Sequence, residues 1–423
     1  MAADRLNLIR LVPAKEGSAR RRPGGQPISA PTDTDFVDLP TATEVVVVGA
    51  GLIGLAVARE LELRGIDTVV LDSSPDASSA AGYVAAGMLA PVGELDFGEA
   101  DLLGMNLSSA GLYPGFVAEL EAETGLETGY GRAGGLHVAM DSDEVAQMRR
   151  MLDLQVESGL RSSWLGPSRA RELEPGLDPA LRGAVFAEDD GSVDPRLLLE
   201  ALGSYLRSKG VPVSRGVEVV GMEIGSGSVR AIRLAAGERI EAGTVVIAAG
   251  AYSGRLEWLE APLRPRVRPV KGQVVELAGE PGDPITGRII ASERVYVVPR
   301  PDGRLVVGAT VEEEGFDRGV TAGGVHELLR EAYRLLPEVA ELGFIGARAG
   351  LRPGTPDNLP IVGRSRDLAG LVYATGHYRN GVLLTPLTAR AVGEMIARDG
   401  ESPPGMEPAD PSRFTDRVGA GAR

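Results

Sequence analysis

The sequence contains no cysteine among its 423 residues. This absence excludes disulfides, cysteine-ligated zinc, iron–sulfur clusters and a cysteine nucleophile. Only three histidines occur, His137, His326 and His377, and no two of them have the spacing of a metal-binding pair. We therefore expect no protein-bound metal, and we expect any redox chemistry to come from an organic cofactor.

Long apolar runs are also missing, because no stretch approaches the roughly 20 apolar residues of a membrane-spanning helix. Arg20, Arg21 and Arg22 could belong to an export signal, but Pro23 and Gly24 follow them instead of an apolar segment. The 59 acidic residues outnumber the 44 basic ones, and the net charge of −15 disfavours a nucleic-acid partner. These features predict a cytoplasmic protein without a membrane or nucleic-acid partner.

Glycine, by contrast, is abundant, with 57 residues, and one glycine-rich segment lies in an informative place. The valines at 45–48 predict a strand buried on both faces. The segment Gly49-Ala50-Gly51-Leu52-Ile53-Gly54 follows directly and opens a predicted helix over 55–64. A second strand over 68–71 completes a βαβ unit of about 30 residues.

The three glycines of this segment have distinct roles in a dinucleotide-binding turn. Gly49 permits the tight turn, Gly51 lets a pyrophosphate approach the backbone, and Gly54 allows close helix–strand packing. The helix N-terminus offers free N–H groups to phosphates, and Asp72 suits a ribose hydroxyl pair. The unit predicts dinucleotide binding but does not distinguish NAD from FAD.

Further elements follow from local signals. Capping residues predict a helix from Asp141 to about Glu157 and another over 196–207 after Asp194-Pro195. Strands are expected at 212–220, in a hairpin of 229–234 with 239–240, and at 244–250 and 371–376, with antiparallel strands between about 262 and 315.

The spacing of these elements predicts an α/β fold. Its Rossmann-like dinucleotide domain is built from several chain segments and is interleaved with an antiparallel-sheet domain. We expect a disordered extension at 1–40, the dinucleotide domain at 41–100, 190–255 and 345–400, the second domain at 101–189 and 256–344, and a flexible tail at 401–423.

A second loop, 376–386, follows a strand and leads into a helix predicted over 384–397. Its backbone amides could face an anion such as the pyrimidine edge of a reduced flavin. An ordinary loop with a helix cap explains the same pattern equally well.

Five segments together carry a family resemblance. In chain order they are Ala85-Ala86-Gly87-Met88-Leu89-Ala90-Pro91, Pro269-Val270-Lys271-Gly272, Tyr296-Val297-Val298-Pro299-Arg300, Gly350-Leu351-Arg352-Pro353-Gly354-Thr355-Pro356-Asp357 and Gly376-His377-Tyr378-Arg379-Asn380-Gly381. They resemble the glycine oxidases of thiamine biosynthesis, which belong to the D-amino-acid oxidase superfamily. The resemblance implies an FAD domain beside a substrate domain with a large antiparallel sheet.

The glycine motif and the resemblance together give the expected FAD contacts. These are Gly49, Gly51, Leu52, Ile53, Gly54, Asp72, Ser73, Ala81, Gly82, Ala86, Gly87, Met88, Val219, His377, Tyr378, Arg379, Asn380, Gly381, Val382 and Leu383. The segment 79–84 departs from the small, hydroxyl-rich pattern of some relatives. Because covalent flavin in this superfamily often uses a cysteine, the cysteine-free chain is expected to hold FAD non-covalently.

For the substrate, the resemblance places Arg352 as the carboxylate clamp, with Tyr296 and Arg379 lining the pocket. A glycine-sized substrate must be oriented through its carboxylate, and the guanidinium fork of arginine suits that task. Without the resemblance, a surface ion pair is the favoured explanation for either arginine.

The implied reaction is oxidative deamination of glycine, sarcosine or a small D-amino acid to the imine, with O₂ reduced to H₂O₂ and no obligatory acid or base residue. The imine of glycine would supply the thiazole of thiamine. Other flavin amine oxidases, acting on sarcosine, proline or D-amino acids, remain alternatives, as do an NAD(P)-dependent dehydrogenase and a non-catalytic nucleotide-binding module. The resemblance further implies a homo-oligomer, often a tetramer.

Overall fold

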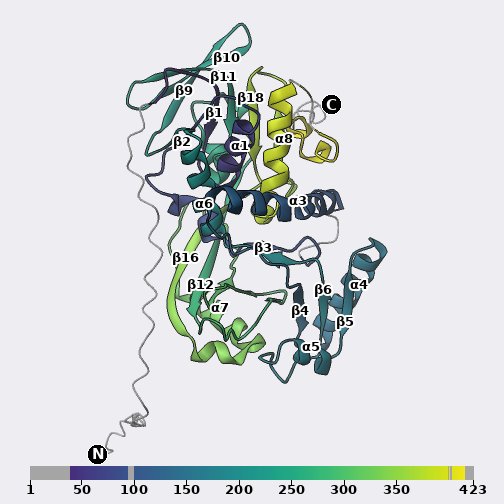
Figure 1. The fold of residues 1–423 in the computed structure, drawn as a ribbon. Coiled ribbons are helices and arrows are strands. Elements are labelled where there is room, and N and C mark those ends of the chain that lie inside the picture. Colours follow the sequence, from purple (N-terminus) through teal and green to yellow (C-terminus); the bar gives the residue numbers. More distant parts are fainter. Residues whose placement is uncertain (1–38, 94–99, 399, 401–402, 415–423) are drawn as a thin grey trace, which may run out of the picture.

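The computed structural model describes residues 39–93, 100–398, 400 and 403–414. Two large sheets form its upper and lower parts in Figure 1. The predicted α/β fold class is confirmed. The extension expected at 1–40 and much of the tail expected at 401–423 lie outside the described residues.

The first sheet has a parallel centre. Its main path runs β17-β18-β11-β1-β2-β8, in which only the β17–β18 pair is antiparallel. The strands are β1 (Ala42–Val48), β2 (Thr68–Asp72), β8 (Val213–Arg215), β11 (Arg239–Ile247), β17 (Ile361–Arg364) and β18 (Leu371–Thr375). An antiparallel hairpin, β9 (Val219–Gly225) and β10 (Ser228–Leu234), extends the sheet from β11.

Both faces of this sheet are covered, which explains the run of valines in β1. Val45 and Val47 pack into a core with the helices α1 (Leu52–Glu62), α3 (Ala100–Thr124), α6 (Pro195–Ser208) and α8 (Thr385–Arg398). Val46 and Val48 face the opposite core, which includes residues of the β9–β10 hairpin. Side chains that alternate between two buried faces favour a continuous β-branched run.

The second sheet runs β16-β12-β15-β14-β13-β4-β6-β5, and its neighbours are antiparallel except for the β13–β4 pair. Its strands are β4 (Gly135–Ala139), β5 (Ser162–Leu165), β6 (Gly183–Ala187), β12 (Arg268–Ala278), β13 (Ile289–Ala291), β14 (Tyr296–Pro299), β15 (Arg304–Gly308) and β16 (Gly343–Gly354). The helices α4 (Ser142–Glu157), α5 (Pro167–Leu173) and α7 (Ala322–Leu335) pack against it.

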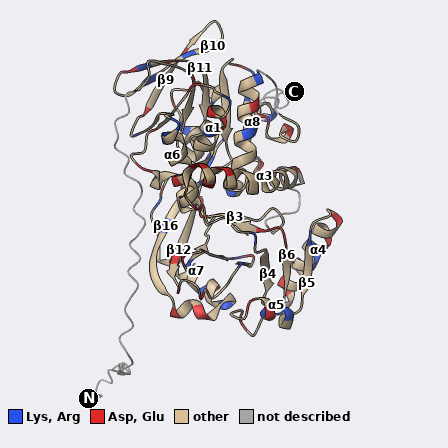
Figure 2. Cartoon of the chain, viewed as in Figure 1, with Lys and Arg blue, Asp and Glu red and all other residues tan. Residues whose placement is uncertain are grey.

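Short elements connect the two sheets. The helix α2 (Ala81–Val84) contacts both α6 and β16, and the strands β3 (Met88–Leu89) and β7 (Gly191–Ser192) pair between the two halves of the molecule (Figure 1). Lys, Arg, Asp and Glu residues are interspersed over the elements of both halves (Figure 2). Among the described residues, none of the helices is both long and apolar enough to cross a membrane.

The structure differs from the expected domain division at three places. α3 was expected in the second domain but packs against α6 and α8, because its apolar residues join the first core. β16 was expected in the first domain but is the edge strand beside β12. In the predicted tail, Met406 and Ala409 are buried in the first core. The remaining boundaries stay predictions.

Two strand predictions also need correction. The strand expected over 212–220 is interrupted and forms the separate strands β8 and β9. The hairpin arm at 239–240 and the buried strand at 244–250 are one strand, β11, which ends at Ile247. β11 is continuous because its first residues pair with β10 while its later residues pair with β18.

Candidate active site

A cavity of about 1070 Å³ lies between the two sheets. It opens at the carboxyl ends of β1, β2, β11 and β18, where open α/β sheets place their ligands. It also reaches β12, β14 and β16 of the second sheet. Of the expected site residues it is lined by Gly49, Gly51, Leu52, Ile53, Asp72, Ser73, Ala81, Gly82, Ala86, Gly87, Met88, Val219, Tyr296, Arg352, His377, Tyr378, Arg379, Gly381 and Val382.

The glycine turn presents bare backbone to this cavity. A Cβ on Gly49 would lie 2.4 Å from the Ala248 carbonyl oxygen, and one on Gly54 would lie 1.9 Å from that of Gly49. These two positions therefore require glycine for packing, and Gly54 does not line the cavity. A Cβ on Gly51 would meet only Ala80, at 3.9 Å, and Gly51 begins α1 without a side-chain cap. The free amides at this helix end face space that an anion can enter.

Asp72, at the end of β2, lies beside the glycine turn. Its Oδ2 accepts a hydrogen bond from the Ala50 amide (2.7 Å), and its Oδ1 accepts one from the Ser74 amide (2.8 Å). An ionised carboxylate has about four acceptor sites, so these two bonds fix its orientation and leave capacity for ligand hydroxyls.

The segment Ala86–Met88 lines the cavity and is held from behind. Gly87 has a φ of +71°, and a Cβ there would lie 2.1 Å from the Val193 carbonyl oxygen. The guanidinium of Arg300 donates to the carbonyls of Val193 (2.9 Å) and Ala86 (2.5 Å). The backbone of this segment is thereby fixed against β7 and the start of α6.

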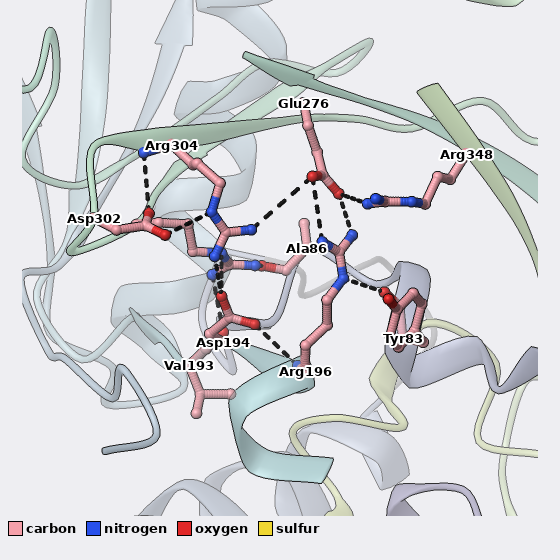
Figure 3. A network of polar contacts seen from close by, with 10 residues as sticks. Tyr83, Ala86, Val193, Asp194, Arg196, Glu276, Asp302, Arg304 and Arg348 are labelled. Atoms are coloured by element: carbon pink, nitrogen blue, oxygen red, sulfur yellow. Dashed lines mark hydrogen bonds and ion pairs between the residues drawn. The ribbon is translucent and has the colours of Figure 1, made fainter. Parts of the chain in front are cut away.

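Arg300 belongs to a buried network of charges, most of which Figure 3 labels. Asp194 lies within 3.6 Å of Arg300 and 2.9 Å of Arg304. Glu276 pairs with Arg196 and Arg348. Burial alone would raise the pKa of each carboxyl group, but the arginines outweigh burial and lower both pKa values.

Arg196 extends this network to α2, because its Nε donates to the Tyr83 carbonyl (2.9 Å, Figure 3). The network thus connects the second sheet and the start of α6 to the segment that lines the cavity.

The second loop closes another side of the cavity. Gly376 and Tyr378 have positive φ values of 77° and 45°. Asn380 and Leu383, expected to contact the cofactor, are buried outside the cavity lining. The side chain of Asn380 bonds Asn106 (3.3 Å), and the Leu383 carbonyl accepts a bond from Ser109 (2.6 Å).

The support from α3 was missed by reasoning from the sequence. The Tyr113 hydroxyl donates to the Val382 carbonyl (2.9 Å), so Asn106, Ser109 and Tyr113 all contact the loop. Their spacing places three polar residues on one face of a helix. That spacing was the signal available in the sequence.

His377 is 2% exposed, and its Nε2 lies 2.9 Å from the Thr388 hydroxyl. Burial lowers the pKa of His377 to about 3. The imidazole is therefore neutral at physiological pH and cannot serve as a proton donor in its charged form.

Arg352, on β16, places its guanidinium against the backbone of β12. A Cβ on Gly272 would lie 2.4 Å from its Nη1. Nη1 donates to the carbonyls of Thr310 (3.0 Å) and Lys271 (3.3 Å). Tyr296 of β14 lines the same cavity, and its ring lies against Gly308. Arg379 is exposed, with its guanidinium 5.4 Å from the centre of the Tyr378 ring.

Several lining residues were not expected from the sequence. Tyr252 and Arg255 belong to the 3₁₀ helix η2 (Gly250–Arg255), which follows β11. The centre of the Tyr252 ring and the guanidinium carbon of Arg255 each lie 5.1 Å from the centre of the Phe316 ring. Arg318 donates to the Ser78 carbonyl (2.6 Å). The segment between β15 and α7 therefore bridges the two sides of the cavity.

The residues present fit an FAD. The cavity runs from a bare glycine turn, past an acidic side chain, to an arginine on the second sheet. The opening at Gly51 would be filled by a side chain at that position. In the part of the chain that the structure describes, no group of three or more His, Asp or Glu residues could hold a metal ion.

Comparison with known proteins establishes the family. Residues 44–395 match the model of the FAD-dependent oxidoreductase (DAO) family, and the chain belongs to this family. FAD is therefore the cofactor, and the NAD(P) alternative is not supported.

Individual relatives agree. The chain is 33% identical to a glycine oxidase of Geobacillus kaustophilus, over 89% of this chain and 98% of the relative. It is 36% identical to the bifunctional protein ThiO/ThiG of Synechocystis, over 88% of this chain but 54% of the relative. The chain thus spans about half the length of the bifunctional relatives. The crystal structure of the G. kaustophilus glycine oxidase matches with a TM-score of 0.82 and 32% identity, covering 88% of this chain and 99% of that structure.

Proposed function

We propose that this protein oxidises glycine, and with it sarcosine and small D-amino acids, to the corresponding imine. The observation that carries the proposal is Arg352. Its guanidinium lies in the cavity that also contains the glycine turn, and its orientation is fixed by two backbone carbonyls. The relatives named glycine oxidase support the choice of substrate.

Arg352 binds the substrate carboxylate. Its Nη1 is occupied by two carbonyls, and among the described residues its Nε and Nη2 have no acceptor, so they are available to a ligand. An arginine fork binds a carboxylate through two parallel charge-assisted hydrogen bonds. Tyr296 lines the cavity on a neighbouring part of the same sheet and limits the room around the substrate. Arg379, at the exposed edge, completes the binding site.

When bound, FAD supplies a two-electron acceptor that dioxygen can reoxidise. The substrate amine must be neutral so that its lone pair can assist loss of the Cα hydrogen. We propose that orientation of the substrate by Arg352 and exclusion of water supply the rate. The pKa of about 3 makes the buried His377 imidazole a poor proton acceptor. For glycine the balance is glycine, O₂ and water giving glyoxylate, ammonia and H₂O₂, with the imine as the first product.

The residues proposed to contact FAD are those of the glycine turn, Asp72, Ser73, the segments 81–82 and 86–88, Val219, and the loop residues 377–379 and 381–382. Asn380 and Leu383 serve instead to hold that loop. We further propose non-covalent FAD, a cytoplasmic location, a homo-oligomer, and use of the glycine imine for the thiazole of thiamine. These proposals are supported by the sequence resemblance.

The test is the visible spectrum of the purified protein before and after anaerobic addition of glycine. A yellow protein that bleaches with glycine, and then releases H₂O₂ in air, supports the proposal. Peroxide release from glycine, sarcosine, D-alanine and D-proline ranks the substrates. A protein that neither binds added FAD nor bleaches with any of the four contradicts it.

A further inference from the structure

The orientation of Arg352 depends on two backbone carbonyls, those of Lys271 and Thr310. Both accept from the same nitrogen, Nη1, so their positions set the plane of the guanidinium and the direction of its remaining N–H groups. Lys271 belongs to β12. Thr310 begins the segment 310–321 between β15 and α7, which we call the strap.

A single carboxylate in the strap contacts both residues whose carbonyls accept hydrogen bonds from Arg352. Glu312 accepts hydrogen bonds from the Thr310 hydroxyl and from Gln273 Nε2 (2.8 Å). Its Oε2 lies 3.3 Å from Lys271 Nζ. The backbones of Lys271 and Glu312 also exchange two hydrogen bonds, of 2.9 and 3.0 Å. Movement of Glu312 would therefore displace both groups that hold Arg352.

The charged side chains of Lys271 and Glu312 lie largely inside the protein. The side chain of Lys271 is 1% exposed, and that of Glu312 is 24% exposed. Burial alone would lower the pKa of Lys271, but Asp317 and Glu312 raise it. Burial would likewise raise the pKa of Glu312, but Thr310, Gln273 and Lys271 lower it. Both groups are charged at neutral pH, and a buried charge of this kind is costly unless it is paired.

We propose that Glu312 is a positioning residue for the substrate-binding arginine. Through Thr310 and Lys271 it fixes the two carbonyls that orient the Arg352 guanidinium toward the substrate carboxylate. The inference rests on the proposed function of Arg352 and assigns a role to a residue outside the cavity lining.

The neighbouring sequence offers a matched control. Glu313 follows directly, but its side chain is 60% exposed and pairs with the surface residue Arg268 at 3.3 Å. Glu313→Gln removes the same charge, one residue away, without touching Thr310, Lys271 or Arg352. Comparison of the two variants therefore separates the position of the carboxylate from the loss of a negative charge.

In the experiment, glycine kinetics and acetate binding are measured for the FAD-loaded wild type, Glu312→Gln, Glu313→Gln and Arg352→Ala. Acetate has the carboxylate of glycine without the amine, and its binding is followed through the flavin absorption spectrum. A glutamine at 312 keeps the shape but cannot accept all three donors. We expect the KM for glycine and the Kd for acetate to rise about tenfold, which corresponds to about 1.4 kcal/mol.

Other results distinguish the positioning role of Glu312 from the substrate-binding role of Arg352. If Arg352→Ala weakens acetate binding but Glu312→Gln does not, the positioning role is wrong and the proposed function stands. If Arg352→Ala leaves both constants unchanged, the substrate clamp itself is wrong. A Glu312→Gln variant that lowers kcat alone, with KM and acetate binding intact, also overturns the positioning role.

A second pair of variants serves if Glu312→Gln fails to fold. Thr310→Val replaces the hydroxyl that donates to Glu312 with a methyl group of similar size, and Thr310→Ser keeps that hydroxyl. We expect Thr310→Val to weaken acetate binding and Thr310→Ser to restore it. Equal acetate affinity in these two variants contradicts the proposal.

Discussion

The replacement of Arg352 by alanine tests the substrate clamp directly. The change removes the bidentate partner of the substrate carboxylate, and it also leaves the Lys271 and Thr310 carbonyls without their Nη1 donor. A hydrogen bond to a charged group contributes about 1.5–3 kcal/mol. We therefore expect kcat/KM for glycine to fall at least about 100-fold, which corresponds to roughly 2.7 kcal/mol.

The assay is H₂O₂ release over a range of glycine concentrations, with FAD content matched between variants. Arg352→Lys keeps the charge but loses the planar fork, and we expect its kcat/KM to lie between those of the wild type and Arg352→Ala. The control is Arg268→Ala, which removes a partly exposed arginine that also donates to a backbone carbonyl, that of Thr355. An unchanged KM for glycine in Arg352→Ala would refute the clamp.

Three further predictions follow from the cofactor side of the cavity. Gly54→Ala forces a Cβ toward the Gly49 carbonyl oxygen, and we expect the free energy of unfolding to fall by about 1–3 kcal/mol. Gly51→Ala has room for its Cβ, so we expect unchanged stability but weaker FAD binding. Urea unfolding measures the stability and FAD titration measures the binding, and equal stability of the two variants would contradict the packing argument. Tyr113→Phe removes the hydrogen bond to the Val382 carbonyl. We expect the free energy of unfolding, measured in urea, to fall by about 1–2 kcal/mol and the Kd for FAD to rise. Wild-type values in both measurements would show that α3 does not hold the loop. In the unfolded chain His377 binds a proton below about pH 6.5, whereas in the folded protein it stays neutral down to about pH 3. Its contribution to the free energy of unfolding is therefore complete above about pH 6.5 and is lost as the pH falls, by about 1.4 kcal/mol per pH unit. Unfolding measured at several pH values should show that His377→Asn removes this pH dependence and that the exposed His326→Asn does not.

The βαβ unit could be predicted from the sequence because its information is local. Four valines, three glycines at fixed spacing and a terminal Asp72 all lie within about 30 residues of one another, the size of a βαβ unit. The structure shows the strand, turn and helix in that order, with the carboxylate of Asp72 bonded to the amide of Ala50 inside the turn.

The helix α3 could not be predicted in the same way. Its sequence contains Gly104, Gly111, Pro114 and Gly115, which are weak or unfavourable residues inside a helix. It is helical because residues such as Met105 and Leu120 are buried in a core shared with α6 and α8. Tertiary packing of this kind outweighs local propensity.

The loop after β18 shows a second limit of sequence reasoning. Its motif predicted that every residue from His377 to Leu383 contacts the cofactor, yet the side chain of Asn380 bonds Asn106 and Leu383 is buried in the core. The direction of each side chain follows from the backbone turns at Gly376 and Tyr378, and motif spacing alone does not determine those turns. β16 was misplaced for a related reason, since its Arg352 lines the cavity that also contains the glycine turn while its backbone pairs with β12.

The order in which the cavity-lining strands occur along the chain has a consequence for biosynthesis. The glycine turn follows β1, but the adjacent strands β11 and β18 begin only at Arg239 and Leu371. A ribosome must therefore synthesise the chain beyond Leu371 before the sheet around the turn can close. FAD can then be enclosed only after β18 has been synthesised, and a truncated chain ending before Leu371 would lack one wall of the binding cavity.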